Sequence, residues 1–186
     1  MNPQRKEDLL LKVVNVFVSF LFLGTNIYLA VPPQSTYGNI KQTYLTPASW
    51  AFFVWPVIHV LLYGTTIYQF SSARGKTIVI DGISWWFPLM TIVNVIFLVA
   101  WANHYHTIAF ILSLFLCYIS ANIEWTIEKY YPPQTVADEL FVHLPFSVWD
   151  AWVFIICILT AFEAFGVDAT EHQDGIGTKI CVFLVL

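Results

Sequence analysis

The sequence predicts an all-α integral membrane protein, a helical bundle of five transmembrane helices followed by the start of a sixth. Five apolar stretches each approach the roughly 20 residues that cross a bilayer. Hydrophobic residues make up 58% of the chain and charged residues 11%, whereas soluble domains carry about 25% charged residues. Most of the charged residues lie between the stretches. The bilayer is therefore the expected solvent of one transmembrane domain that covers residues 1–186.

The five predicted helices cover approximately residues 9–31, 47–70, 83–101, 107–125 and 141–167. Pro32 and Pro33 end the first helix, and Pro47 begins the second, because proline interrupts a helix interior but fits its first turn. The short connection 102–106 predicts that the third and fourth helices form an antiparallel hairpin. Two further prolines follow the fourth helix at 132–133 and separate it from the fifth.

A last apolar segment, residues 180–186, is too short to cross a membrane. Seven helical residues extend only about 10 Å at 1.5 Å per residue. We expect this segment to be the truncated start of a sixth helix.

The distribution of basic residues predicts the orientation of the chain. With five spans, one side carries Arg5, Lys6, Lys12, Arg74, Lys76 and Lys129, and the other carries only Lys41 and Lys179. Because basic loops stay on the cytoplasmic side, the N-terminus is expected in the cytoplasm. The first apolar stretch is also too long for a signal peptide, so we expect it to remain as an anchor of a multi-pass protein.

Three polar residues are expected near the middle of the membrane. Counted from the cytoplasmic ends of their helices, His59 and Asn94 lie about 16 Å deep and Asp150 about 14 Å deep. An aspartate at this depth must be protonated or paired, and His59 or Asn94 is a suitable donor. The trio has two interpretations, a structural hydrogen-bonding contact between helices or a contact to a polar group on a ligand.

Aromatic side chains follow these polar residues at helical spacing. Phe52 and Trp55 precede His59 on one face, and Trp101 follows Asn94 two turns later. A pocket that is walled by rings and carries few polar groups suits a flat apolar ligand. Such stripes also occur in ordinary packing, so the prediction depends on their combination with the polar trio.

Several functional classes find no support in the sequence. No lysine lies in mid-helix, and there is no glycine-rich phosphate loop or Ser-His-Asp arrangement, so neither catalytic residues nor a nucleotide site are assigned. Cys117, Cys157 and Cys181 are dispersed within apolar segments and match neither a disulfide framework nor a zinc site. No metal ligands are assigned, and the acidic net charge of −4 excludes nucleic acid as an expected partner.

Two motifs resemble the TspO/MBR family of tryptophan-rich sensory and translocator proteins. The first is Tyr44-Leu-Thr-Pro-Ala-Ser-Trp-Ala-Phe-Phe-Val-Trp-Pro-Val-Ile-His59, and the second is Leu144-Pro-Phe-Ser-Val-Trp-Asp-Ala-Trp152. The similarity is closest to the longer multispan branch of that family, in which further helices follow the fifth. The motifs cover about 25 residues, and the five-helix layout extends over the whole chain.

The resemblance implies a membrane receptor or carrier that binds a tetrapyrrole or a sterol-like molecule inside the bundle. No cofactor is otherwise indicated, and a porphyrin or a sterol is the expected ligand class. The expected partners are the lipid bilayer, this small hydrophobic ligand and a second copy of the chain in a homodimer. The candidate ligand-binding residues are Trp50, Phe52, Trp55, His59, Asn94, Trp101, Trp149, Asp150 and Trp152.

Two alternatives to ligand binding are carried forward. One is a proton-coupled transporter or intramembrane enzyme that uses His59 and Asp150 as acid and base. The other is a membrane scaffold without a small ligand. Binding is favoured over catalysis because no catalytic set is present in the sequence.

Overall fold

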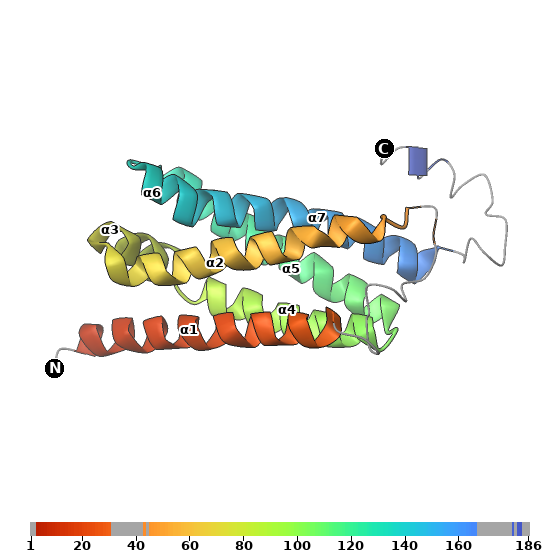
Figure 1. The fold of residues 1–186 in the computed structure, drawn as a ribbon, viewed down its shortest axis with the longest axis horizontal. Helices are drawn as coiled ribbons and strands as arrows, with labels where there is room; N and C mark the ends of the chain where they lie inside the picture. The colour runs from red at the N-terminus through yellow and green to blue at the C-terminus, as the bar shows by residue number, and fades with distance from the viewer. Residues whose placement is uncertain (1–2, 31–42, 44, 167–179, 181, 184–186) are drawn as a thin grey trace.

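The computed structural model describes residues 3–30, 43, 45–166, 180 and 182–183, and in this part of the chain all regular structure is helical (Figure 1). The elements in chain order are α1 (Pro3–Ala30), η2 (Ser49–Phe53), α2 (Val54–Ser71), α3 (Ala73–Lys76), η3 (Thr77–Ile83), α4 (Trp86–Ala102), α5 (His106–Tyr130), α6 (Val136–Asp138), η4 (Glu139–His143) and α7 (Leu144–Phe165). The predicted all-α class is confirmed.

Four of the described helical segments are long and apolar enough to cross a membrane, at Lys6–Tyr28, Trp50–Ser71, His106–Tyr130 and Val136–Phe165. A fifth is obtained when Ala73–Ile83 and Trp86–Ala102 are taken as one span, which is bent by 63° at its break. The bend coincides with the positive φ of 53° at Ser84. The expectation of an integral membrane helical bundle is thereby confirmed.

The helices extend beyond the predicted apolar stretches. Helix α1 begins at Pro3 instead of residue 9, because hydropathy marks the part of a helix inside the membrane and not its polar first turns. The predicted loops 71–82 and 128–140 are largely helical, a correction to the sequence analysis. The connections at 31–42 and 167–179, and most of the predicted sixth helix at 180–186, lie outside the described residues.

Polar side chains explain why the two predicted loops are helical. The Ser72 hydroxyl accepts a hydrogen bond from the Gly75 amide at 3.2 Å and caps α3. Thr135 and Asp138 form a capping box at the start of α6. Both caps satisfy amides that a helix start leaves without partners. The π-helical elements η3 and η4 then join these short helices to α4 and α7.

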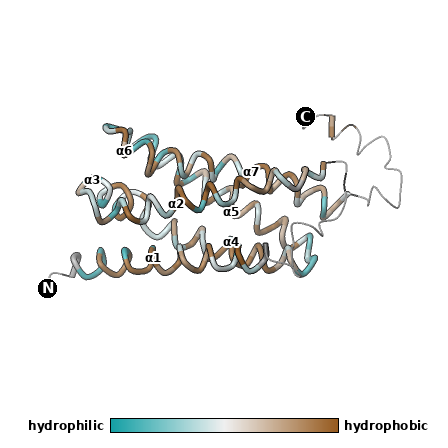
Figure 2. The backbone as a smooth tube through the Cα atoms, in the orientation of Figure 1, coloured by the Kyte–Doolittle hydropathy of each residue, from teal (hydrophilic) through white to brown (hydrophobic). Residues whose placement is uncertain are grey.

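The long helices pack in a closed ring in the order α1, α2, α7, α5, α4 and back to α1. Apolar residues dominate the long helices, and hydrophilic residues are frequent around α3 and α6 at one end of the bundle (Figure 2). Large apolar side chains such as Phe17, Val60 and Phe154 point outward and are more than 60% exposed. A helix that is apolar on its outer face as well as its inner face is typical of a bundle surrounded by lipid.

Asp138 connects several helices at one end of this ring. This is the end where α1 begins and where α3 and α6 lie (Figure 1). Its fully buried carboxylate accepts hydrogen bonds from Tyr68 Oη at 2.8 Å and Arg74 Nε at 2.7 Å. The amides of Gln134 and Thr135 each donate to the same carboxylate at 3.0 Å. This contact joins α2 and α3 to the start of the last span.

We expect Asp138→Asn to lower the stability of the detergent-solubilised protein by about 2 kcal/mol, because the substitution leaves buried donors without an anionic acceptor. Thermal unfolding followed by circular dichroism measures the effect. Asp8→Asn is the matched control, since the Asp8–Lys76 ion pair is more exposed and pairs of this kind contribute at most about 1 kcal/mol. Equal losses in both variants would contradict the structural role of Asp138.

Candidate ligand-binding site

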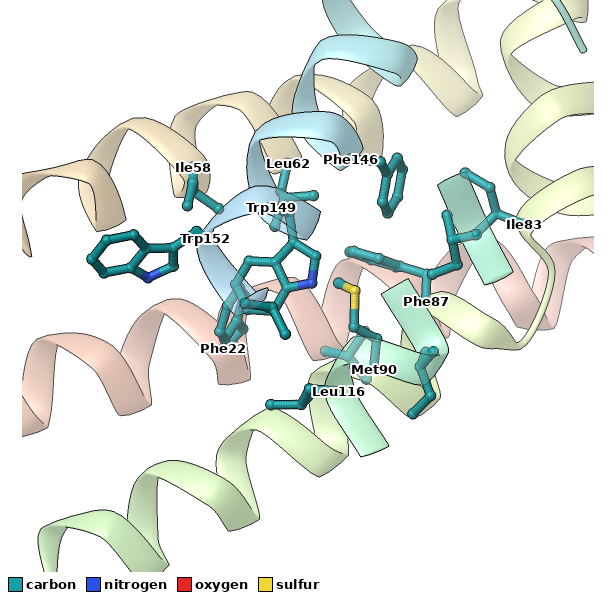
Figure 3. Close-up of a cluster of buried hydrophobic side chains, with 14 of the residues drawn as sticks. Phe22, Ile58, Leu62, Ile83, Phe87, Met90, Leu116, Phe146, Trp149 and Trp152 are labelled. Carbon is teal, nitrogen blue, oxygen red and sulfur yellow. The ribbon is translucent and has the colours of Figure 1, made fainter. Parts of the chain in front are cut away.

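The interior of the ring contains a cluster of aromatic side chains from α1, α2 and α7 (Figure 3). The Phe22 ring lies 4.4 Å from the His59 ring and 5.2 Å from the Trp149 ring, measured between centroids. Trp55 lies 5.7 Å from Trp149 and 5.9 Å from Trp152. The edge-to-face and tilted orientations of these pairs are those that aromatic rings prefer.

Helical spacing brings the members of this cluster together. Trp149 and Trp152 are three residues apart on α7, and Trp55 and His59 are four residues apart on α2. Residues at these separations share one helix face. Figure 3 shows Trp149 between Phe22 of α1 and Leu62 of α2. We call Phe22, Trp55, His59, Trp149 and Trp152 the aromatic cluster.

The short helix η2 extends the cluster toward α4. The Phe52 ring lies 5.9 Å from Trp152 and 6.2 Å from Trp101. The indole N–H of Trp101 donates to the Glu163 carboxylate of α7 at 2.6 Å. Phe52 and Trp101 therefore lie at the edge of the cluster, and the Trp101 indole is directed to Glu163.

Several buried polar atoms in this region have no hydrogen-bond partner among the described residues. They are the indole nitrogens of Trp55, Trp149 and Trp152, and His59 Nε2. On α4, both amide atoms of Asn94 also lack a partner among the described residues. A buried indole N–H usually finds an acceptor, and leaving a buried polar group unpaired costs about 1–3 kcal/mol. The concentration of such atoms around one aromatic cluster indicates a site that can bind acceptor groups of a ligand.

Asp150 faces away from the aromatic cluster. The Ser120 hydroxyl of α5 donates a hydrogen bond to its carboxylate, so Asp150 is paired with Ser120 instead of the expected His59 or Asn94. One residue corresponds to a rotation of about 100° around a helix. Consequently Trp149 enters the interior while its neighbour Asp150 lies at the contact with α5. The depth of a residue, which the sequence predicts, does not specify this rotation.

A comparison with protein families agrees with this architecture. The family model described as TSPO-like protein matches residues 12–185. The chain belongs to the TSPO-like family. No curated protein and no solved structure matches it. The resemblance to TspO/MBR proteins that the two motifs indicated is thereby confirmed.

The structure brings most of the predicted site residues of the TSPO-like protein to one region. Trp55, His59, Trp149 and Trp152 belong to the aromatic cluster, whereas Trp50 is 73% exposed and points out of the bundle. Asn94 is fully buried on α4. It lies two helical turns from Trp101 on the same face.

Two residues in the region were absent from the predicted set. Phe22 contacts three members of the aromatic cluster, but no motif or polar neighbour distinguishes it within the apolar sequence of α1. Glu163 is only 5% exposed and accepts from Trp101. The sequence feature that could have identified Glu163 is its position within an apolar helix, because a carboxylate in a membrane span is costly. Among the described residues, no group of three His, Cys, Asp or Glu side chains is arranged to bind a metal.

We expect Asn94→Leu to raise the stability of the unliganded protein by about 1 kcal/mol, because leucine has a similar volume and no unpaired amide. Thermal unfolding in detergent checks this value. Gln69→Leu is the contrasting variant, because Gln69 accepts a hydrogen bond from Asn15 at 3.0 Å, and its loss leaves a buried donor unpaired. A loss of stability in Asn94→Leu would show that the amide is satisfied in the native protein.

Proposed function

We propose that this TSPO-like protein is a receptor or carrier that binds a flat hydrophobic ligand inside the bundle, at the aromatic cluster. The observation that carries the proposal is the set of buried indole nitrogens that have no acceptor among the described residues. Rings stack on a flat ligand, and N–H groups fix its orientation through its oxygen atoms.

The number of donors favours one ligand class over the other. A sterol offers a single hydroxyl group, whereas a tetrapyrrole with acidic side chains offers several carboxylate oxygens. The indoles of Trp55, Trp149 and Trp152 provide three donors. A tetrapyrrole is therefore the better chemical match. Because the rings of the cluster are in mutual contact, binding requires them to separate.

Neither a His59–Asp150 acid–base pair nor a scaffold without a ligand is favoured by the described contacts. An acid–base pair of His59 and Asp150 requires the two side chains to meet, but Asp150 is bonded to Ser120 of α5. A scaffold without a ligand gives no reason for unpaired indoles in the interior, since phenylalanine would pack as well without the polar atom.

We also propose that the N-terminus faces the cytoplasm. Lys12, Arg74, Lys76 and Lys129 all lie toward the end of the bundle where α1 begins. This agrees with the tendency of basic residues to stay on the cytoplasmic side. Proteolysis of an N-terminal tag in sealed, oriented vesicles tests the assignment.

Titration of the purified protein with protoporphyrin, followed by the absorbance change of the porphyrin, tests ligand binding. We expect saturable binding that Trp149→Phe combined with Trp152→Phe weakens by about 30-fold, since two hydrogen bonds of about 1 kcal/mol each are lost while an aromatic ring remains at each position. Trp50→Phe is the matched control and should bind as the unmodified protein does.

The outcomes separate the candidate functions. Porphyrin binding that does not saturate, or that is equal in the double variant and the control, would contradict the proposed site. Cholesterol that displaces porphyrin from the unmodified protein but not from the double variant would assign a sterol to the same site.

A further inference from the structure

The contact between α5 and α7 carries a row of polar side chains that the ligand site does not use. The two antiparallel helices place polar residues opposite one another along their contact. Five pairs are in contact, namely Glu128 with His143, Glu124 with Ser147, Ser120 with Asp150, Ser113 with Thr160, and His106 with Glu163. Between them Cys117 contacts Val153 of α7, which lies one turn from Cys157. We call the five pairs together with Cys117 and Cys157 the α5–α7 polar row.

The five pairs are in direct contact. Glu128 and His143 approach to 3.0 Å, Ser147 donates to Glu124 at 2.5 Å, and Ser120 donates to Asp150. Ser113 and Thr160 are hydrogen-bonded at 3.0 Å, and His106 lies 3.5 Å from Glu163. The Cys117 thiol donates to the Val153 carbonyl oxygen at 3.7 Å, on α7 between Asp150 and Cys157. Protonatable or hydroxyl groups therefore follow one another along the whole contact.

The α5–α7 polar row is long enough to connect the two membrane surfaces. From His106 to Glu128 the helix rises by roughly 33 Å, compared with a hydrocarbon thickness of about 30 Å. At one end the Glu128 side chain is 58% exposed. At the other end Glu163 and His106 line an open depression of about 450 Å³ together with His104. Both ends are accessible from the water on their side.

The contact between α1 and α2 shows what polar residues look like when they only hold helices together. Asn15 donates to Gln69 at 3.0 Å, and Ser19 is bonded to Thr66 at 2.9 Å. All four side chains are neutral amides or alcohols, which suffice to join helices in a membrane. In the α5–α7 polar row, by contrast, the carboxyl groups of Glu124 and Asp150 lie between the ends of the helices, and each end adds a carboxyl group paired with an imidazole. Ionisable groups within a span are costly and mark ion or proton pathways.

From this contrast we infer that the α5–α7 polar row is a proton pathway across the membrane. His143 is positioned at the entrance of the pathway to receive a proton. Its Nδ1 faces the Glu128 carboxylate, and its Nε2 faces the Tyr131 carbonyl oxygen at 3.1 Å. A ring that carries protons on both nitrogens satisfies both acceptors. The inference concerns a different helix contact from the ligand site and does not depend on ligand binding.

Transfer along the α5–α7 polar row proceeds between neighbouring groups. Each successive pair is one helical turn from the last on at least one of the two helices, with about 5–6 Å between Cβ atoms, a distance that one bridging water spans. Glu124 Oε2 is buried and has no hydrogen-bond partner among the described residues, so it can accept from such a water on the way to Asp150. Each step breaks one O–H, N–H or S–H bond as the next forms. The group that gave up its proton then receives another proton from the preceding group in the row. The proton leaves at Glu163 and His106, and no oxidant or cofactor is consumed.

Proton flux into vesicles tests the inference. The full chain is reconstituted in phosphatidylcholine liposomes that contain the pH dye pyranine, and a potassium diffusion potential set by valinomycin drives protons inward. We expect acidification faster than in empty liposomes, and we expect Asp150→Asn to slow it by at least about tenfold because the amide cannot exchange a proton in its place. Asp150→Glu should restore most of the flux.

Thr66→Val is the matched control, since it removes a hydroxyl group from the neutral α1–α2 contact and should leave the flux unchanged. Size-exclusion chromatography of every variant shows whether it is folded, and Glu124→Gln replaces Asp150→Asn if the latter aggregates. Flux equal to that of empty liposomes, or equal flux in the unmodified protein and the folded variant, would overturn the inference.

Discussion

The position of α7 between α2 and α5 is the constraint on which the rest of the structure depends. One face of this helix sends Trp149 and Trp152 into the interior, where they contact Trp55 of α2. An adjacent face places Asp150 against Ser120 of α5. Because neighbouring residues differ by about 100° around the axis, a single helix contributes to two chemically different contacts. The aromatic cluster and the α5–α7 polar row are therefore set by the same rotation of α7.

The polar groups of the α1–α2 contact and of the α5–α7 polar row differ in how much free energy their burial in a bilayer costs. Neutral groups such as Asn15 and Thr66 satisfy one another between α1 and α2, which contributes modestly to stability at a small desolvation cost. Carboxyl groups such as Glu124 and Asp150 impose a larger cost, which packing alone does not explain. Asp138 differs from Glu124 and Asp150, because four donors surround its carboxylate. These hydrogen bonds join α2 and α3 to the start of the last span.

The sequence predicted much of the site, but not its arrangement. Trp55, His59, Trp149 and Trp152 were predicted from the two motifs, and all four are in the interior. Trp50 was included because it belongs to the same motif, yet its position in the short helix η2 turns it outward. Phe22 was not predicted, since nothing distinguishes one phenylalanine from another in an apolar helix that is surrounded by lipid and protein.

Hydrophobicity and helix length by themselves determined that this chain is an all-α membrane bundle, because backbone groups in lipid must be satisfied within each span. The sequence also predicts a similar depth for His59, Asn94 and Asp150, since this prediction needs only a count of residues along a helix. Only the tertiary structure decided which residues meet, because the rotation of each helix depends on how its neighbours pack. For that reason Asp150 was expected to pair with the wrong helix, and the α5–α7 polar row became visible only when the two helices were brought together.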